Sequence, residues 1–148
     1  MNGNQRHREI TYLNTMLLLK NYRAITWMLE SLLKSDNYEY NDAIYNVNNG
    51  MLNIQKMKEL VEKVNDALFF LKQKPGDGEY LFELINLSYI VPESRTHDEL
   101  LHCLNISSRQ YYRMREHSIN ILSLKLWSVP SKDSEYWYEM LIWLDQML

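Results

Sequence analysis

The stretch THDELLHCLNISSRQYYRMREHSINILSLKLW, residues 96–127, determines the fold that the sequence predicts. Its first helix begins with a capping box, in which Thr96 and Glu99 each satisfy the other's free backbone amide. Apolar residues at helical spacing follow: Leu100, Leu101 and Leu104. Asn105 fits the next turn, because asparagine tolerates the left-handed conformation that ends a helix. The sequence therefore predicts a short amphipathic helix that ends in a tight turn.

A second capping box, from Ser107 to Gln110, begins the next predicted helix. The face that we expect to pack on the core carries Tyr111, Met114, Ser118, Ile121 and Leu122. The residues that fall largely off this face are Ser108, Arg109, Tyr112, Arg113, Arg115 and Glu116. Two short helices joined by a tight turn, the second rich in arginine, are typical of a helix-turn-helix whose second helix lies in the major groove of DNA.

The charge of this second helix favours contact with nucleic acid. Residues 107–127 hold four basic residues against one acidic residue, a formal balance of +3, whereas the whole chain carries −3. A locally basic helix on an acidic protein is the arrangement that attracts phosphate. Two capped helices also occur in helical proteins that never contact nucleic acid. A protein-interaction module with a vestigial helix-turn-helix is therefore an alternative.

Three runs carry a resemblance to a known family: YLFELINLSYI at residues 80–90, THDEL at 96–100 and LNISSRQYYR at 104–113. They resemble the ArpU-type phage regulators, described as phage packaging and lysis (late gene) transcriptional regulators. Residues 118–123 and the pair Leu126-Trp127 are similar to that family's usual ending, whereas the tail beyond Trp127 is longer and more aromatic. The stretch is more distantly similar to the promoter-reading end of sigma factors.

The resemblance implies a sequence-specific DNA-binding regulator of phage or prophage late genes, acting in the cytoplasm of a bacterial host. Its partner would be double-stranded DNA, and the likeness to sigma factors further implies a contact with RNA polymerase. A different class of function is also open at this point. A helical, oligomeric DNA-recognition subunit of a phage packaging machine would need the same helices.

Individual roles follow from position on the second helix, which we expect to span residues 108–127. Arg109 and Arg113 are candidates for base edges, because early positions of a recognition helix point into the groove. Ser108 and Tyr112 could reach bases or phosphate. Arg115 is a candidate for the phosphate backbone, since it points about 200° away from Arg113 on a helix.

The region before this module, residues 1–78, is expected to be helical with a flexible loop near residues 35–50. Residues 1–8 are polar and expected to be frayed. Apolar residues keep a helical period over residues 9–34 and 52–74. Such stripes indicate either core or a seam between partner helices, so we expect a homo-oligomer. Residues 1–34 also carry a balance of +3, which is either a second contact with DNA or polymerase or a solvated helix face.

Two breaks divide the rest of the chain. Pro75-Gly76-Asp77-Gly78 precedes a helix predicted over residues 79–90, which supplies the third helix of a module spanning 79–127. Residues 128–131 end the second helix. The segment 128–148 then contains a short helix with one apolar side: Trp137, Met140, Leu141, Leu144 and Met147. We expect it to pack on the module or to form an interface. The predicted fold is all-α, with long amphipathic helices, a sigma-like helix-turn-helix and a short C-terminal helix.

Motifs for other kinds of function are absent from the sequence. Four glycines do not make a phosphate-binding loop, and no nucleophile stands beside a base, so we expect a non-enzyme without a cofactor. The spacing of His97, His102, Cys103 and His117 matches no zinc pattern, so no metal is expected. The lone Cys103 makes no internal disulfide and fits a reducing cytosol. No signal peptide or membrane span is apparent.

Overall fold

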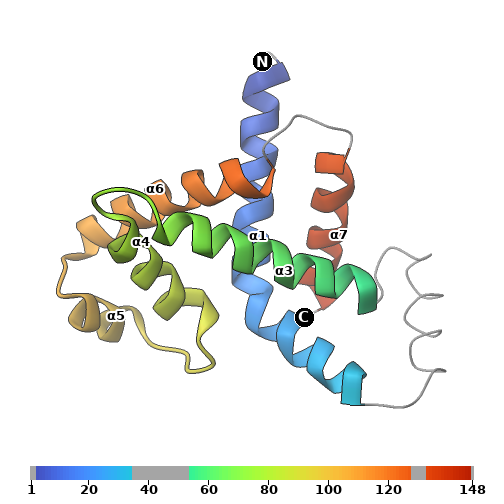
Figure 1. Ribbon diagram of the computed structural model, residues 1–148, viewed down its shortest axis with the longest axis horizontal. Helices are drawn as coiled ribbons and strands as arrows, with labels where there is room; N and C mark the ends of the chain where they lie inside the picture. Colours follow the sequence, from blue (N-terminus) through green and yellow to red (C-terminus); the bar gives the residue numbers. More distant parts are fainter. Residues whose placement is uncertain (1–2, 35–53, 128–132, 148) are drawn as a thin grey trace.

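The computed structural model of the protein describes residues 3–34, 54–127 and 133–147. Every regular element within these ranges is a helix, so the predicted all-α fold is confirmed. The predicted flexible loop near residues 35–50 and the break at residues 128–131 lie outside the described residues. Figure 1 shows one long helix, α1 (Gly3–Lys34), with the other helices arranged around it.

Helix α1 begins at Gly3 rather than at Glu9, so the expectation that residues 1–8 are frayed is wrong for residues 3–8. This first stretch has no apolar period to reveal a helix. It contains Asn, Gln and Arg, which a helix accepts at little cost, and its residues extend a helix that the core already stabilises.

Helix α3 (Ile54–Lys72) buries one face at helical spacing: Met57, Leu60, Val64, Ala67, Leu68 and Leu71. The break predicted at residues 75–78 follows it, and Gly76 there has a φ of 93°. Gly78 begins α4 (Gly78–Ile85) where the chain approaches α3 closely. A Cβ on Gly78 would lie 2.7 Å from the backbone oxygens of Leu71 and Lys72, so a residue without a side chain is required there.

The helix predicted over residues 79–90 changes type part-way. Helix α4 ends at Ile85, and Asn86–Ile90 continue as one turn of π-helix, η1. Arg23 of α1 holds the end of this turn: its Nε donates to the Val91 carbonyl over 2.7 Å and its Nη2 to the Leu87 carbonyl over 3.4 Å. A guanidinium bonded to carbonyls that a helix end leaves free stabilises that end.

Helices α5 (His97–Leu104) and α6 (Ser108–Leu126) begin and end at the predicted residues or within one residue of them. The Ser107 capping box is complete, because Ser107 Oγ accepts from the Gln110 amide and Gln110 Oε1 accepts from the Ser107 amide. The Thr96 box is half formed. Thr96 Oγ1 accepts from the Glu99 amide, but the Glu99 carboxylate accepts from the Thr96 hydroxyl rather than from its amide. Asn105 is left-handed, with φ 54° and ψ 50°.

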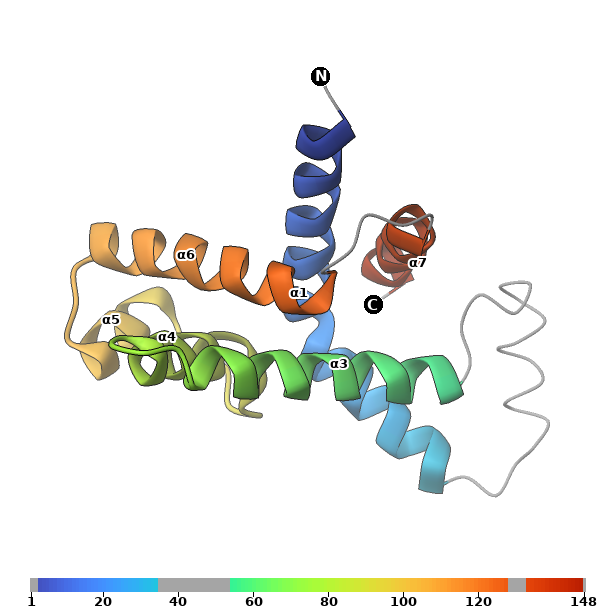
Figure 2. The same ribbon diagram turned by 45° about the horizontal axis from the view of Figure 1, so that its top comes forward.

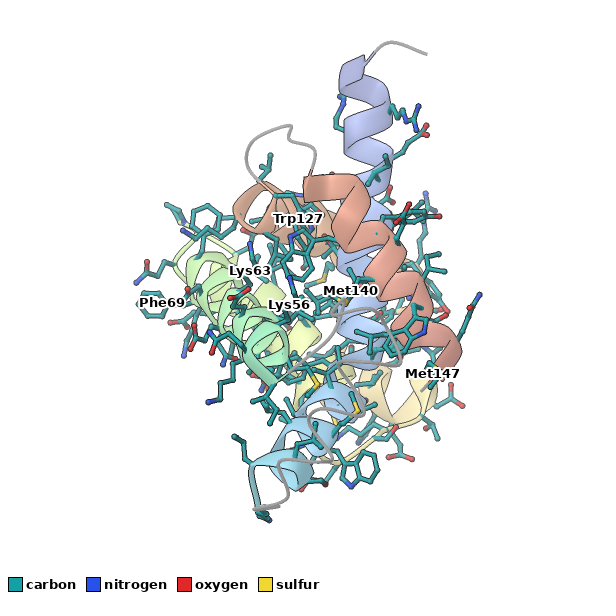
Figure 3. All side chains as sticks on the ribbon, turned by 90° about the vertical axis from the view of Figure 1, so that its right-hand side faces the viewer. Lys56, Lys63, Phe69, Trp127, Met140 and Met147 are labelled. Carbon is teal, nitrogen blue, oxygen red and sulfur yellow. The ribbon has the colours of Figure 1, made fainter. Side chains whose placement is uncertain are left out.

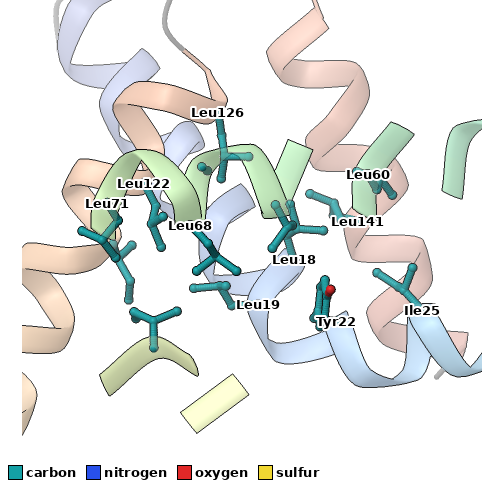
Figure 4. Packing of buried hydrophobic residues seen from close by; sticks show 14 of the residues in the cluster. Leu18, Leu19, Tyr22, Ile25, Leu60, Leu68, Leu71, Leu122, Leu126 and Leu141 are labelled. Atoms are coloured by element: carbon teal, nitrogen blue, oxygen red, sulfur yellow. The ribbon is translucent and has the colours of Figure 1, made fainter. Parts of the chain in front are cut away.

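One hydrophobic cluster joins the helices of all three predicted segments, residues 1–78, 79–127 and 128–148. Its members include Leu18 of α1, Leu68 of α3, Leu122 of α6 and Leu141 of α7 (Asp133–Met147), and Figure 4 shows these side chains facing one another. The apolar stripes of α1 and α3 are therefore largely buried within the chain itself. The core fixes where α6 lies.

Helix α7 packs beside α1, as Figure 1 shows. Its Met140, Leu141 and Leu144 are buried, whereas Met147, expected on the same side, is 62% exposed. Asn21 Nδ2 donates to Asp145 Oδ1 over 3.0 Å, and Lys20 pairs with the same carboxylate, so the pKa of Asp145 lies below its ordinary value. Trp137 contacts Trp127 at the end of α6, with the ring centroids 6.0 Å apart.

Candidate nucleic-acid interface

The two halves of α6 have different surroundings. In the second half, Ile119, Leu122 and Leu126 are buried in the shared core. In the first half, residues 108–117, Tyr111 is the single buried side chain and most others are exposed. Figure 2 shows this half extending away from α1, with α5 and α4 beside it. The core therefore holds α6 by its C-terminal half and presents its N-terminal turns to solvent.

A buried polar network fixes the anchored half against α1. Ser123 Oγ lies 2.7 Å from Thr15 Oγ1, and Trp127 Nε1 donates to that threonine oxygen over 3.1 Å. Thr15 is fully buried, and its hydroxyl also donates to the Thr11 carbonyl. Because buried polar groups are costly when unsatisfied, these bonds favour one position of α6 along α1.

Arg109, Arg113 and Glu116 are all exposed and share one side of the first half of α6. At 100° per residue, Arg113 lies about 40° from Arg109 and Glu116 about 60° from Arg113. Among the described residues, neither arginine has a hydrogen-bond or ion-pair partner. Two free guanidinium groups one helical turn apart can therefore meet an external acceptor together. Sequence reasoning missed Asn120, which is exposed on the same side, seven residues after Arg113.

Arg115 has a different position. It is half-buried, its guanidinium carbon lies 5.0 Å from the centroid of the Tyr112 ring, and its Nε is buried with no hydrogen-bond partner among the described residues. It also faces Tyr89 of η1: burial raises the pKa of Tyr89, and the nearby Arg115 charge partly opposes that rise. The structure thus brings Arg109 and Arg113 together and places Arg115 on the inner side of the helix.

Ser108 and Tyr112 lie on the side of α6 that faces α5. The Oγ of Ser108 shares a hydrogen bond of 3.0 Å with His97 Nε2. The His97 ring stacks on Tyr112, with centroids 5.3 Å apart and planes at 27°, and meets Tyr111 edge-on at 5.2 Å. Tyr111 is buried and its Oη bonds Ser88 Oγ over 2.9 Å. Ser108 and Tyr112 are accordingly exposed, and contacts with His97 of α5 restrict both side chains.

An open groove of about 760 Å³ runs between α6 and the turn after α3. Gln110, Arg113 and His117 line one wall, and Asp77 and Tyr80 lie opposite. The hydrogen bond from Lys74 lowers the pKa of Asp77, so that carboxylate is charged at neutral pH and lies 4.0 Å from His117. Lys74 pairs with this carboxylate, and Arg113 lies on the opposite wall, so the groove carries charges of both signs.

The basic residues of the N-terminal segment are partly used within the fold. Lys20 pairs with Asp145 at 3.1 Å, and Arg23 binds backbone carbonyls at the end of η1. On α6 itself, the Lys125 ammonium lies 5.8 Å from the Phe70 ring centroid, on the side of α3. These groups contribute to the fold more directly than to a second nucleic-acid surface.

Within residues 3–34, 54–127 and 133–147, no three His, Cys, Asp or Glu side chains are grouped as metal ligands would be. In the same part of the chain, no helix combines the length and the apolar character that crossing a membrane requires. When the chain is compared with protein-family models, curated proteins and solved structures, nothing matches it. The resemblance to the ArpU-type regulators accordingly stays an expectation from the sequence.

Proposed function

We propose that this protein is a sequence-specific DNA-binding transcriptional regulator of phage or prophage late genes. In this proposal α6 enters the major groove from Ser108 onward, and α5 braces it. The observation that carries the proposal is the pair Arg109 and Arg113, which have no partner among the described residues and lie on the projecting half of a basic helix in an acidic protein. Proximity to phosphate is then favourable for this helix.

The dimensions of α6 suit this role. A helix with its side chains is about 10–12 Å across, and the major groove is about 12 Å wide. The ten residues 108–117 span roughly 15 Å, which is enough to cross the groove floor. An arginine fork pairs with the O6 and N7 atoms of guanine, and a glutamate accepts from cytosine N4. Arg109, Arg113 and Glu116 on one side therefore favour a site that contains G·C pairs.

The cellular setting of the proposal is a bacterial host cytoplasm, with double-stranded DNA as the partner, RNA polymerase as a second contact and no catalytic step. Self-association is supported by apolar side chains that the fold leaves outside: Phe69 of α3 is 63% exposed and Leu124 of α6 is 69% exposed. Figure 3 shows Phe69 pointing away from the body of the protein. A two-fold dimer would place two recognition helices about 34 Å apart, one turn of DNA.

A selection of bound duplexes from a random pool tests the proposal directly. The wild-type chain should enrich one motif. Arg113→Ala should then lose preference at one base position of that motif. Lys34→Ala is the matched control, because it removes the same charge from an exposed residue at the far end of α1 and should change nothing. A wild-type chain that enriches no motif would refute the proposal and favour the protein-interaction module.

The second candidate is a helical, oligomeric DNA-recognition subunit for phage packaging. The exposed Phe69 and Leu124 favour it as well, since a ring needs an interface on each subunit. Light scattering distinguishes the two proposals. A dimer or monomer supports the regulator, whereas a large closed oligomer supports the packaging subunit.

A further inference from the structure

His97 is the residue through which α5 contacts the exposed side of α6. Its Nε2 shares the 3.0 Å hydrogen bond with Ser108, and its ring stacks on Tyr112 at 5.3 Å. Ser108 and Tyr112 are separated by one helical turn. A single imidazole therefore orients two neighbouring side chains at the start of the helix.

This arrangement restricts side chains that exposure would otherwise leave mobile. Tyr112 is 49% exposed, and an exposed tyrosine ordinarily exchanges between rotamers. Here the ring has His97 stacked on it, the edge of Tyr111 at 5.4 Å and the Arg115 guanidinium at 5.0 Å. Aromatic stacking and cation–π contact both have a preferred geometry, so together they favour one orientation of the ring.

We propose that His97 is a positioning residue that sets part of the base preference of α6 by fixing Ser108 and Tyr112, an inference that rests on the proposed DNA binding. His97 acts through these two side chains. The Ser108 hydroxyl can bond a base or phosphate, and from this rotamer the Tyr112 ring and hydroxyl can meet a thymine methyl or a base edge.

Loss of His97 should change the base preference of α6 but not its affinity for unrelated DNA. The attraction of α6 for any DNA depends on its four basic side chains rather than on His97, Ser108 or Tyr112. Freeing Tyr112 and Ser108 leaves this attraction intact, but the correct duplex must then order both side chains on binding. Discrimination should fall while affinity for unrelated DNA stays constant.

Removal of His97 should not unfold α5. The helix is capped by Thr96, and Leu100 and Leu104 anchor it in the core. His97 is partly exposed and lies in the first turn. Substitutions there accordingly test positioning rather than folding, and thermal unfolding of each variant verifies this.

Two substitutions divide the contacts of His97. His97→Phe keeps a ring against Tyr112 and Tyr111 but gives Ser108 no polar partner. His97→Gln keeps a polar group but removes the ring. His102→Ala is the control, because His102 is an exposed histidine on the same helix without these contacts. Base preference is measured by selection from a random duplex pool, and the mobility of Tyr112 by fluorine NMR of the DNA-free, fluorotyrosine-labelled protein, assigned with Tyr112→Phe.

We expect His97→Gln to shift the Tyr112 signal toward that of a free tyrosine. The ratio of affinities for the selected and a scrambled duplex should fall about fivefold, as the loss of one or two weak contacts does. His97→Phe should leave the NMR signal of Tyr112 close to that of the wild type. It should lose base preference only at the base position that Ser108 contacts. A wild-type chain that enriches a motif, with His97→Gln enriching it equally, overturns the role of His97. A wild-type chain that enriches none overturns DNA binding itself, and the role of His97 with it.

Discussion

Substitution of Arg113 and of Arg115 should have different effects, although both residues are arginines on one helix. Arg113 is exposed and has no partner among the described residues, whereas Arg115 is half-buried beside Tyr112 and Tyr89. Arg113→Ala should remove a base contact and relax specificity at one position of the site. Arg115→Ala should weaken binding to all duplexes by a similar factor, because a phosphate or structural contact carries no sequence information.

The magnitudes separate the two effects further. A bidentate arginine–guanine pair discriminates by about 1–3 kcal/mol, so Arg113→Ala should lower affinity for the preferred site roughly five- to 150-fold. Its removal should not change the stability of the fold by more than about 0.5 kcal/mol, as for other exposed residues. Arg115→Ala loses a cation–π contact of about 0.5–1 kcal/mol, but it also removes a buried Nε without a hydrogen bond, so the two effects on stability partly offset.

Fluorescence anisotropy with the preferred and a scrambled duplex gives both affinities, and thermal unfolding gives the stability of each variant. Lys34→Ala again controls for the loss of one charge. If Arg115→Ala changes base preference and Arg113→Ala weakens every duplex equally, then the face that contacts the bases is the opposite one. The proposed orientation of α6 in the groove would then have to be rotated by about 180° about the helix axis.

Three other results follow from the same contacts. Because α6 carries four basic side chains, Arg109, Arg113, Arg115 and Lys125, the logarithmic salt slope of binding should be no steeper than about −3.6 per module, at about −0.9 per phosphate; a steeper slope in a salt titration would require a second basic surface. Gly78→Ala should lower the melting temperature more than Gly76→Asn, because a Cβ at Gly78 meets two backbone oxygens at 2.7 Å. Gly76 has open space around it, and asparagine tolerates its positive φ. Equal melting temperatures of the two variants in calorimetry would contradict the close approach at Gly78. Thr15→Val keeps the shape of the side chain but leaves the Trp127 indole N–H without its acceptor. Chemical denaturation should therefore show a free energy of unfolding lower by about 1–3 kcal/mol. An unchanged free energy of unfolding would show that the indole finds another partner.

The features that the sequence predicts correctly are those set by near neighbours. The complete Ser107 capping box and the half of the Thr96 box that forms both join residues three apart, and Asn105 takes its left-handed conformation within the turn itself. The position of Arg109 and Arg113 on one side of α6 also follows from their spacing of four residues on a helix. Such features depend on local spacing, which the chain displays directly.

The features that sequence reasoning missed depend on contacts between distant residues. The π-turn at Asn86–Ile90 is held by Arg23, which lies more than sixty residues earlier and gives no local signal. The inner position of Arg115 depends on Tyr89, which the sequence does not place beside it. The role of His97 needs α5 folded against α6. His97 belongs to a group of residues whose spacing matches no zinc pattern, and the structure shows its ring in an aromatic contact with Tyr112.

The two halves of α6 have different surroundings although they form one continuous helix. Nineteen residues from Ser108 to Leu126 form it, and the Thr15–Ser123–Trp127 network fixes one end while Arg109 and Arg113 project from the other. Because a helix transmits position along its length, the core determines where both guanidinium groups lie. Substitutions in the anchored half should accordingly reduce the fraction of folded protein at unchanged base preference. Substitutions of the exposed Arg109 and Arg113 in the projecting half should change base preference at unchanged stability, as the proposed DNA binding requires.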